Sequence, residues 1–475
     1  MISPDPQATH PSEGDFDSRY VWMVSVVVAL GGFLFGWDWV VIGGAKPFFE
    51  SFFKLTEPAL VGWANSCALI GCLAGAVLAG FLSDRLGRKR LLIVAALLFG
   101  TTSVGNALSP TFAIFIAWRI LGGVAIGLAS SLSPMYISEI SPAPMRGRLV
   151  SINQLTIVAG ILVAQVLDWW LVRGLPPGAT DEFIRHSWFG QEGWRWMFGL
   201  TAVPSVLFFV GMLFVPESPR WLEKWGHSGR SRAILARIGG AAYADNSLRE
   251  MKASLSAERH QALRLAELLE PRMRRVLTLG ILLAVFQQWC GINVIFNYAE
   301  EIFRAAGYDI SSVLSNIAWT GSVNLVFTFV ALGAVDKRGR RPLMLVGAGS
   351  LALIYGALGA CYFSGVKGLP MLLLVLAAIG CYAMSLAPVT WVIISEIFPN
   401  RVRGAAMSLA VASLWTACFI LTYTFPLLNA GLGPAGTFWL YSLICAAGFA
   451  FVWAKLPETK GKSLEQLESE LVEAD

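Results

Sequence analysis

Residues 31–45, GGFLFGWDWVVIGGA, decide how this chain folds, because they place an aspartate inside a long apolar stretch. The stretch covers residues 20–45, which is long enough to cross a bilayer as a helix, and Asp38 is its only charge. A carboxylate at that depth costs roughly 2.5–3.5 kcal/mol on insertion scales, so it needs a partner or a proton. The only other charge expected well inside a span is Arg119, in AIFIAWRILGGVAIG. Its similar depth permits a buried pair with Asp38.

The composition is that of a polytopic membrane protein. Of the 475 residues, 56% are hydrophobic and 14% are charged, whereas soluble domains carry about 25% charged residues. Apolar runs of about 20 residues are typical of transmembrane helices, so we expect an all-α integral membrane fold with twelve of them. The expected helices lie near residues 20–45, 59–82, 91–108, 112–138, 149–168, 194–215, 275–303, 312–335, 342–364, 370–395, 404–428 and 434–456.

Several function classes are excluded by what the sequence lacks. Its basic residues recur in alternate loops rather than in one patch, which indicates membrane topology and not nucleic-acid binding. The seven cysteines fall in expected helices at no paired spacing, and HExxH is absent, so we expect no metal and no cofactor. No nucleophile–base pair falls within a span, which argues against an enzyme. The polar N-terminus lacks the basic region of a secretory signal peptide.

The loops also predict topology and organisation. DRLGRKR (84–90), MRGR (145–148), DKRGRR (336–341) and NRVRG (400–404) alternate with loops poor in Lys and Arg, so both termini are expected in the cytoplasm. The plain N-terminus suits a bacterial inner membrane. The predicted parts are an N-terminal tail at 1–19, a six-helix bundle at 20–219, a cytoplasmic helical linker at 220–274, a second six-helix bundle at 275–456 and a C-terminal tail at 457–475.

The two halves repeat. GFLSDRLGRKR matches GAVDKRGRRP at an offset of 252, SEISPAPMRG matches SEIFPNRVRG at 257, and PESPR matches PETKG at 241. Transporters built from such repeats place their site near the midplane, where the halves meet. At an offset of 255, Asp38 aligns with Asn293. The first position titrates and the second does not, which suggests ion coupling in the first half and neutral polar ligand contacts in the second.

The motif FQQWCGIN is the richest candidate for ligand binding. A straight helix would not point Gln287, Gln288 and Asn293 at one place, but a break at Cys290-Gly291 would let them converge beside a polar cavity. Amides both donate and accept hydrogen bonds, which suits sugar hydroxyls. The alternative is that these amides bond neighbouring helices together.

Seven motifs together resemble the sugar porter family of the major facilitator superfamily. They are DRLGRK, PMYISEISPAPMRG, PESPRWL, FQQWCGINVIFNYA, DKRGRR, SEIFPNRVRG and PETKG, in this order over residues 20–465. The bacterial D-xylose:proton symporters are most similar, and the animal facilitative glucose transporters come next. The resemblance implies the major facilitator fold and a carrier, working as a single polypeptide in a lipid bilayer, that imports a monosaccharide with a proton by alternating access.

The resemblance also implies which residues contact the sugar. They are Gln154, Gln287, Gln288, Asn293, Asn324, Trp391 and Trp415. The two tryptophans would stack on the sugar ring, and the alternative for each is packing or an interfacial position. Gln165 shares a helical face with Gln154 and is left open between sugar contact and packing.

Several positions depart from the family pattern, so xylose is not transferred from the xylose symporters as the substrate. Ile161 and Leu414 stand where the xylose symporters carry Gln, and Trp37 and Trp39 flank Asp38 where relatives often have Tyr and Thr. Asn297 likewise stands where many family members carry Tyr.

Charged motifs are the remaining candidates. Asp38 and Arg119 resemble the proton-coupling pair of sugar symporters, and the alternative is a purely structural ion pair. Cytoplasmic charges that recur in both halves resemble a gate, whereas topology alone would explain the arginines but not the repeated acidic residues. The gate candidates are Asp84, Arg88, Glu139, Arg146, Glu217, Arg220, Asp336, Arg340, Glu396, Arg403 and Glu458.

Two rival functions stay open on the sequence. In a facilitative sugar uniporter Asp38 would be structural. A membrane sugar sensor would bind without transporting, although sensors of this family tend to have long cytoplasmic tails and fewer than twenty residues follow Pro457.

Overall fold

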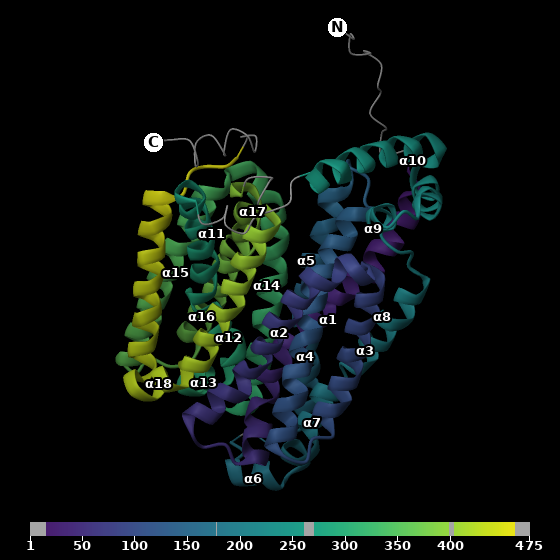
Figure 1. Cartoon of the computed structure of the whole chain (residues 1–475). Helices are drawn as coiled ribbons and strands as arrows, with labels where there is room; N and C mark the ends of the chain where they lie inside the picture. Colours follow the sequence, from purple (N-terminus) through teal and green to yellow (C-terminus); the bar gives the residue numbers. More distant parts are fainter. Residues whose placement is uncertain (1–15, 177, 261–269, 399–402, 461–475) are drawn as a thin grey trace.

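The computed structural model describes residues 16–176, 178–260, 270–398 and 403–460. These residues form helices joined by short turns, and none of them lies in a strand. Two bundles stand side by side, α1–α8 and α11–α18 (Figure 1). The all-helical architecture agrees with the expected membrane fold.

The first bundle begins with five long helices and ends with a broken sixth crossing. Its elements are α1 (Ser18–Phe53), α2 (Pro58–Leu86), α3 (Arg88–Ala107), α4 (Phe112–Ile140), α5 (Arg146–Val172), α6 (Asp181–His186), the π-helical turn η2 (Phe189–Gly193), α7 (Trp194–Gly199) and α8 (Ala202–Phe214). Side-chain caps start some of these helices: Asp17 accepts a hydrogen bond from the Tyr20 N–H at 3.0 Å.

A connecting segment and the second bundle follow. The elements are α9 (Pro219–Lys224), α10 (Ser228–His260), α11 (Pro271–Trp289), α12 (Ile292–Asn297), α13 (Ala299–Ala305), α14 (Ile310–Arg338), α15 (Arg340–Phe363), α16 (Leu369–Met384), α17 (Leu386–Ile397) and α18 (Arg403–Lys455). The run α18 turns back at Gly433, whose φ is 68°. A left-handed φ is readily adopted by glycine, which lets this run form two crossings.

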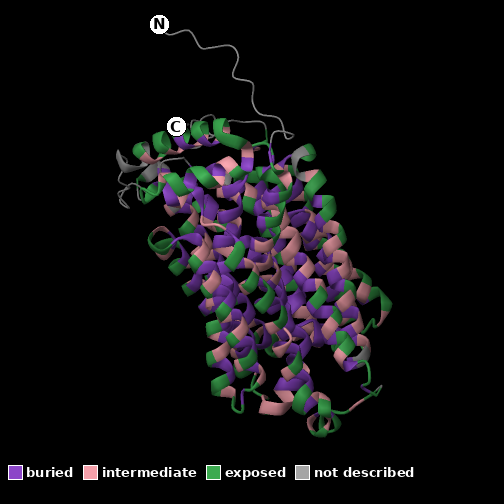
Figure 2. Ribbon diagram, turned by 90° about the vertical axis from the view of Figure 1, so that its right-hand side faces the viewer, coloured by how far each residue is buried: buried purple, intermediate pink, exposed green. Residues whose placement is uncertain are grey.

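Eleven helical segments of the described chain are long and apolar enough to cross a membrane. Because one of them, Ala405–Lys455, turns back at Gly433, the segments account for twelve crossings. Figure 2 shows buried residues through the interior of the bundles and exposed ones along the outside. Large apolar side chains such as Phe214, Leu353 and Phe363 are among the most exposed. In water such a surface would be unfavourable, and a bilayer would cover it.

The first helix is longer than the expected span of residues 20–45, since α1 continues to Phe53. The prediction stopped before Lys46, the first charge after the apolar run. Helix α1 nevertheless buries Lys46, Phe48 and Phe49 in the interior, so tertiary contacts extend this helix.

The bundles contact each other through α2 and α18, through α5 and α14, and through α1 and α12–α13. Glycines permit the closest approaches. A Cβ atom at Gly43 would collide with the Phe296 carbonyl, and one at Gly62 would collide with the Tyr423 carbonyl. Small residues at such crossings are how membrane helices pack backbone to backbone.

The connecting helices mark one end of the molecule, called here the α10 end; the opposite end, near α6, is called the α6 end (Figure 1). Helix α10 is kinked at Gly239 and Gly240. Its Ile238 carbonyl accepts a hydrogen bond from the Asp17 N–H at 2.7 Å, so α1 begins at the α10 end. Parts of the predicted linker and tails, residues 1–15, 261–269 and 461–475, lie outside the described residues.

Candidate functional site

Asp38 and Arg119 meet in the interior of the first bundle. The Arg119 Nη1 atom, from α4, lies 3.2 Å from both carboxylate oxygens of Asp38, on α1. Only 6% of Asp38 and 2% of Arg119 are exposed. The guanidinium also lies 5.4 Å from the ring centre of Phe198. Removing one partner of such a buried pair leaves an uncompensated charge, at a cost of about 3–5 kcal/mol.

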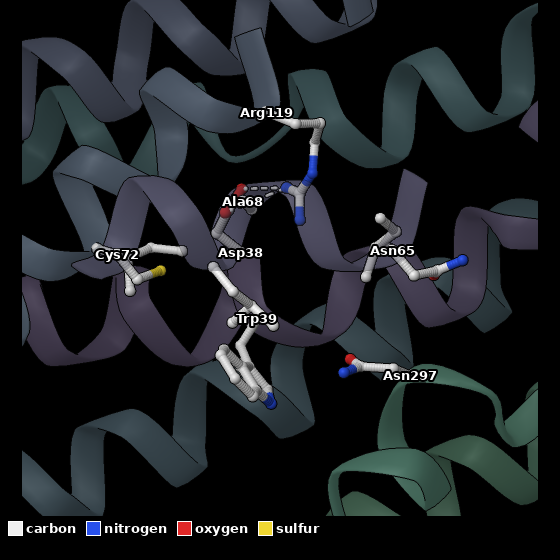
Figure 3. A pocket seen from close by; sticks show the side chains of 10 residues that line it. Asp38, Trp39, Asn65, Ala68, Cys72, Arg119 and Asn297 are labelled. Atoms are coloured by element: carbon white, nitrogen blue, oxygen red, sulfur yellow. Dashed lines mark hydrogen bonds and ion pairs between the residues drawn. The ribbon is translucent and has the colours of Figure 1, made fainter. Parts of the chain in front are cut away.

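A small cavity adjoins this pair. Asp38, Trp39, Asn65, Arg119 and Asn297 line it, together with apolar side chains of α1, α2 and α4 (Figure 3). Asn65 comes from α2 in the first bundle and Asn297 from α12 in the second. The ion pair therefore lies at the contact between the two bundles, beside polar groups from each.

The amide motif converges through the helix break that the sequence predicts. Helix α11 ends at Trp289, Gly291 adopts φ 87°, and α12 starts at Ile292. Gln288 Nε2 donates to Gln287 Oε1 at 2.6 Å, and Asn293 Nδ2 donates to Gln288 Oε1. Gln287 Nε2 in turn donates to the Tyr382 hydroxyl at 2.6 Å. Because all three amides are buried, they form a polar cluster inside the second bundle.

Trp415 extends from α18 to the first bundle. Its ring centre lies 5.9 Å from that of Trp39 and 6.1 Å from that of Phe35. Because Trp39 follows Asp38 in the chain, this aromatic contact connects a predicted sugar residue with the ion pair. Trp391, on α17, is 39% exposed.

The remaining sugar candidates lie on helices that face each other across the bundles. Gln154 is on α5 and Asn324 on α14, and these helices pack together. Asn324 is buried and Gln154 partly so. Gln165, which the sequence left open, donates from Nε2 to Thr320 Oγ1 at 3.4 Å across the same contact. In this conformation Gln165 connects the two bundles.

The charged motif of the first bundle forms a network at the α10 end. Arg88 pairs with Glu139 at 3.0 Å and with Asp84 at 3.2 Å. Glu217 accepts from the backbone N–H groups of Arg88 and Lys89, both at 3.1 Å. Burial raises the pKa of Glu217 above its usual value, against the lowering effect of these N–H groups.

The second bundle repeats this network. Arg340 pairs with Glu396 at 3.1 Å, and Glu458 accepts from the N–H groups of Arg340 and Arg341 at 3.0 and 3.1 Å. Burial acts to raise the pKa of Glu458, but backbone N–H groups outweigh it, so the pKa lies below its usual value. These contacts join residues within one bundle. The side chains of Asp336 and Arg403 lie outside the described part of the chain.

Of the other two gate candidates, Arg146 reaches the Ser141 carbonyl at 3.5 Å, and Arg220 immediately follows Pro219 at the start of α9.

The expectation that Asp38 and Arg119 are the only charges well inside the helices is wrong. Lys46 on α1 is 1% exposed and lies 2.6 Å from Glu301, 3.3 Å from Glu50 and 3.5 Å from Glu300. Glu300 and Glu301 belong to α13 in the other bundle, so this cluster connects the two. The acidic pair in NYAEEIF is the sequence feature that could have indicated this cluster, but the sequence alone does not place that pair beside α1.

Asp168, on α5, is a further buried carboxylate. It lies against Gly44 of α1, and its Oδ2 atom has no hydrogen-bond partner among the described residues. The sequence placed Asp168 at the end of the span 149–168, but α5 continues to Val172. A helix end expected near the surface is instead in the interior.

Comparison with known proteins gives a consistent result. A family model described as Sugar (and other) transporter matches residues 24–471. The chain is 37% identical to the D-xylose-proton symporter of Escherichia coli (strain K12) over 485 residues, which cover 96% of each chain. It is 38% identical to the arabinose-proton symporter of Bacillus subtilis (strain 168) over 450 residues, which cover 94% of each.

A solved structure shares the fold. The partially occluded inward open conformation of the xylose transporter XylE from E. coli matches with a TM-score of 0.82 and 35% identity, covering 94% of this chain and 100% of that one. Family, sequence relatives and fold agree over nearly the whole chain. The chain therefore belongs to the sugar transporter family of the major facilitator superfamily and is a membrane-spanning sugar transporter, not an enzyme.

Proposed function

We propose that this transporter imports a monosaccharide, a hexose or pentose of the D-glucose or D-xylose type, together with a proton. The observation that carries the proposal is the buried Asp38–Arg119 pair beside a cavity that both bundles line. A buried carboxylate in that position can take up a proton when its contact with Arg119 weakens, and it can release the proton when the contact re-forms. Two relatives named as sugar–proton symporters support the same function.

The proposed cycle starts with Asp38 ionised and held by Arg119. A proton from outside neutralises Asp38 and weakens the pair, and a sugar bound by Gln154, Asn324, Trp391, Trp415 and the amide cluster then favours closure of the outer side. Release of the proton to the cytoplasm re-forms the pair and resets the carrier. Such a carrier lies in the inner membrane with both termini in the cytoplasm, and it works as a monomer.

In this cycle the repeated charge networks are the cytoplasmic gate. The same Arg–Glu and Glu–backbone contacts occur at the α10 end of both bundles, which supports a paired role. An interface with two discrete packings is what alternating access requires.

The test uses purified protein in liposomes that contain a pH-sensitive dye. D-glucose, D-xylose, D-galactose and D-fructose are added outside one at a time. Internal acidification with one sugar, absent in protein-free liposomes, is the expected result and names the substrate. Entry of labelled sugar without acidification identifies a uniporter, in which the buried pair is structural. Binding without entry identifies a sensor.

A further inference from the structure

The cavity beside the ion pair contains two buried amide oxygens without partners. Asn65 Nδ2 donates to the Val61 carbonyl at 2.9 Å, which holds the amide in place, and its Oδ1 atom makes no hydrogen bond with the described residues. Asn297 Oδ1 is also without a partner there. Asn65 is 4% exposed and Asn297 is 3% exposed. Both side chains line the same cavity, one from each bundle (Figure 3).

Two buried acceptors on side chains that line one cavity call for hydrogen-bond donors. A buried polar atom left unsatisfied costs free energy, so native structures rarely leave one unexplained. The rest of the lining includes Ile42, Leu69 and Ile126, which offer no hydrogen bond. A hydroxyl group fits this lining, because it can donate to an amide oxygen and accept from Arg119.

Two of the residues that line the cavity are neighbours of predicted sugar residues. Asn297 is one helical turn after Asn293 on α12, so the two side chains share a helix face. Trp39, which lines the cavity, packs on Trp415 with ring centres 5.9 Å apart. A sugar held by Asn293 and Trp415 therefore has this cavity as its neighbour on the side of the ion pair.

We propose that Asn65 and Asn297 each accept a hydrogen bond from a sugar hydroxyl beside Asp38 and Arg119, and that these contacts select which sugar the carrier accepts. The inference rests on the proposed sugar import. It adds a specificity contact from α2, a helix that contributes none of the residues expected to contact the sugar. Because these hydroxyls would lie in a cavity that Asp38 and Arg119 also line, they bring the sugar next to the group that takes the proton.

The test measures sugar binding to the purified full-length protein. The probes are D-glucose, D-xylose and the singly deoxygenated analogues of whichever sugar binds. Asn65→Leu and Asn297→Leu keep the number and branching of the side-chain heavy atoms and remove the acceptor. Asn106→Leu is the matched control, because Asn106 is also a buried asparagine with an unpartnered Oδ1 but does not line the cavity.

The expected result is a tenfold or greater loss of affinity for the parent sugar in both cavity variants and not in Asn106→Leu. For one deoxy analogue, the affinity of the wild type should be as low as the affinity of Asn65→Leu for the complete sugar. Asn65→Leu should bind that analogue no more weakly than the wild type does. If both cavity variants bind every probe as wild type does, or lose the same factor for all analogues, the cavity holds water and the inference fails.

Two further outcomes are read separately. If no sugar binds wild type, the proposed function itself fails. If Asn65→Leu does not fold, Asn65→Ser is used instead. The inference then still requires that this variant no longer binds the complete sugar more tightly than the same deoxy analogue.

Discussion

Asp38 pairs with Arg119 of α4, and its role separates symport from uniport. We expect Asp38→Asn to bind sugar and to exchange it across the membrane, because amide and carboxyl have the same shape. Proton-driven accumulation should be lost, because the amide cannot titrate. Accumulation of labelled sugar against its gradient in proteoliposomes, with an imposed pH gradient, measures this. Uphill uptake by Asp38→Asn would show that the proton binds elsewhere.

Glu217 and Glu458 occupy equivalent places in the repeat, yet their pKa values move in opposite directions. The raised pKa of Glu217 means that its contribution to stability is full below the usual glutamate pKa and is lost as pH rises through the folded value. The lowered pKa of Glu458 means that its contribution is present above the usual value and is lost as pH falls.

These opposite signs give a prediction for unfolding temperature between pH 4 and pH 7. The drop in Tm caused by Glu458→Gln should grow as pH rises, whereas the drop caused by Glu217→Gln should shrink, because Gln resembles the protonated form. Each variant is the control for the other. Parallel pH profiles for the two variants would contradict the difference in environment.

At the scale of elements, the break between α11 and α12 is what assembles the amide cluster. Gly291 sits at φ 87°, where an L-residue costs roughly 1–2 kcal/mol, and a Cβ there would lie 3.0 Å from the Tyr441 ring. We expect Gly291→Ala to lower both Tm and sugar affinity, because the break straightens or shifts.

The control for this change is Gly80→Ala on α2. Gly80 has no atom within 4 Å of an added Cβ, so alanine there should stabilise the helix by about 0.5–1 kcal/mol and leave sugar affinity unchanged. Thermal unfolding and sugar titration measure the Tm and the sugar affinity of the two variants. Wild-type affinity in Gly291→Ala would mean that the amides converge without the break.

At the scale of the whole molecule, Lys46 connects the two bundles through carboxylates of α13. Lys46→Met leaves Glu301 and its neighbours without their shared cation, at about 3–5 kcal/mol for a broken buried pair. Opening this contact lets water reach the carboxylates. We therefore expect faster hydrogen–deuterium exchange in Ala299–Ala305, the α13 helix.

Lys224→Met is the matched control. Lys224 pairs with Asp84 at 2.6 Å, but its side chain is 40% exposed, and surface pairs contribute only about 0–1 kcal/mol. Exchange in α13 should be unchanged in this variant. Equal exchange in Lys46→Met and wild type would mean that the cluster does not hold the bundles together.

The membrane fold and the family followed from local patterns. Apolar runs of about 20 residues predict crossings regardless of what surrounds them, and ordered motifs such as PESPR and PETKG mark the repeat. The Asp38–Arg119 contact could also be predicted from the sequence, because a lone charge in an apolar span has few possible partners. The helix break at Gly291 followed from a glycine beside amides that a straight helix would not bring together.

What only the tertiary structure decided is which side chains meet across the bundles. Lys46 and Glu300 are 254 residues apart. From sequence, Lys46 directly follows the expected span 20–45, and Glu300 lies near the end of the expected span 275–303. Asn65 reads from sequence as a polar residue in an apolar run, and Asn297 reads as the second asparagine of INVIFN. Their shared cavity depends on the crossing of α1, α2 and α12, which is set by the packing of many residues in both bundles. Local patterns determine that helices form, and packing determines which faces they share.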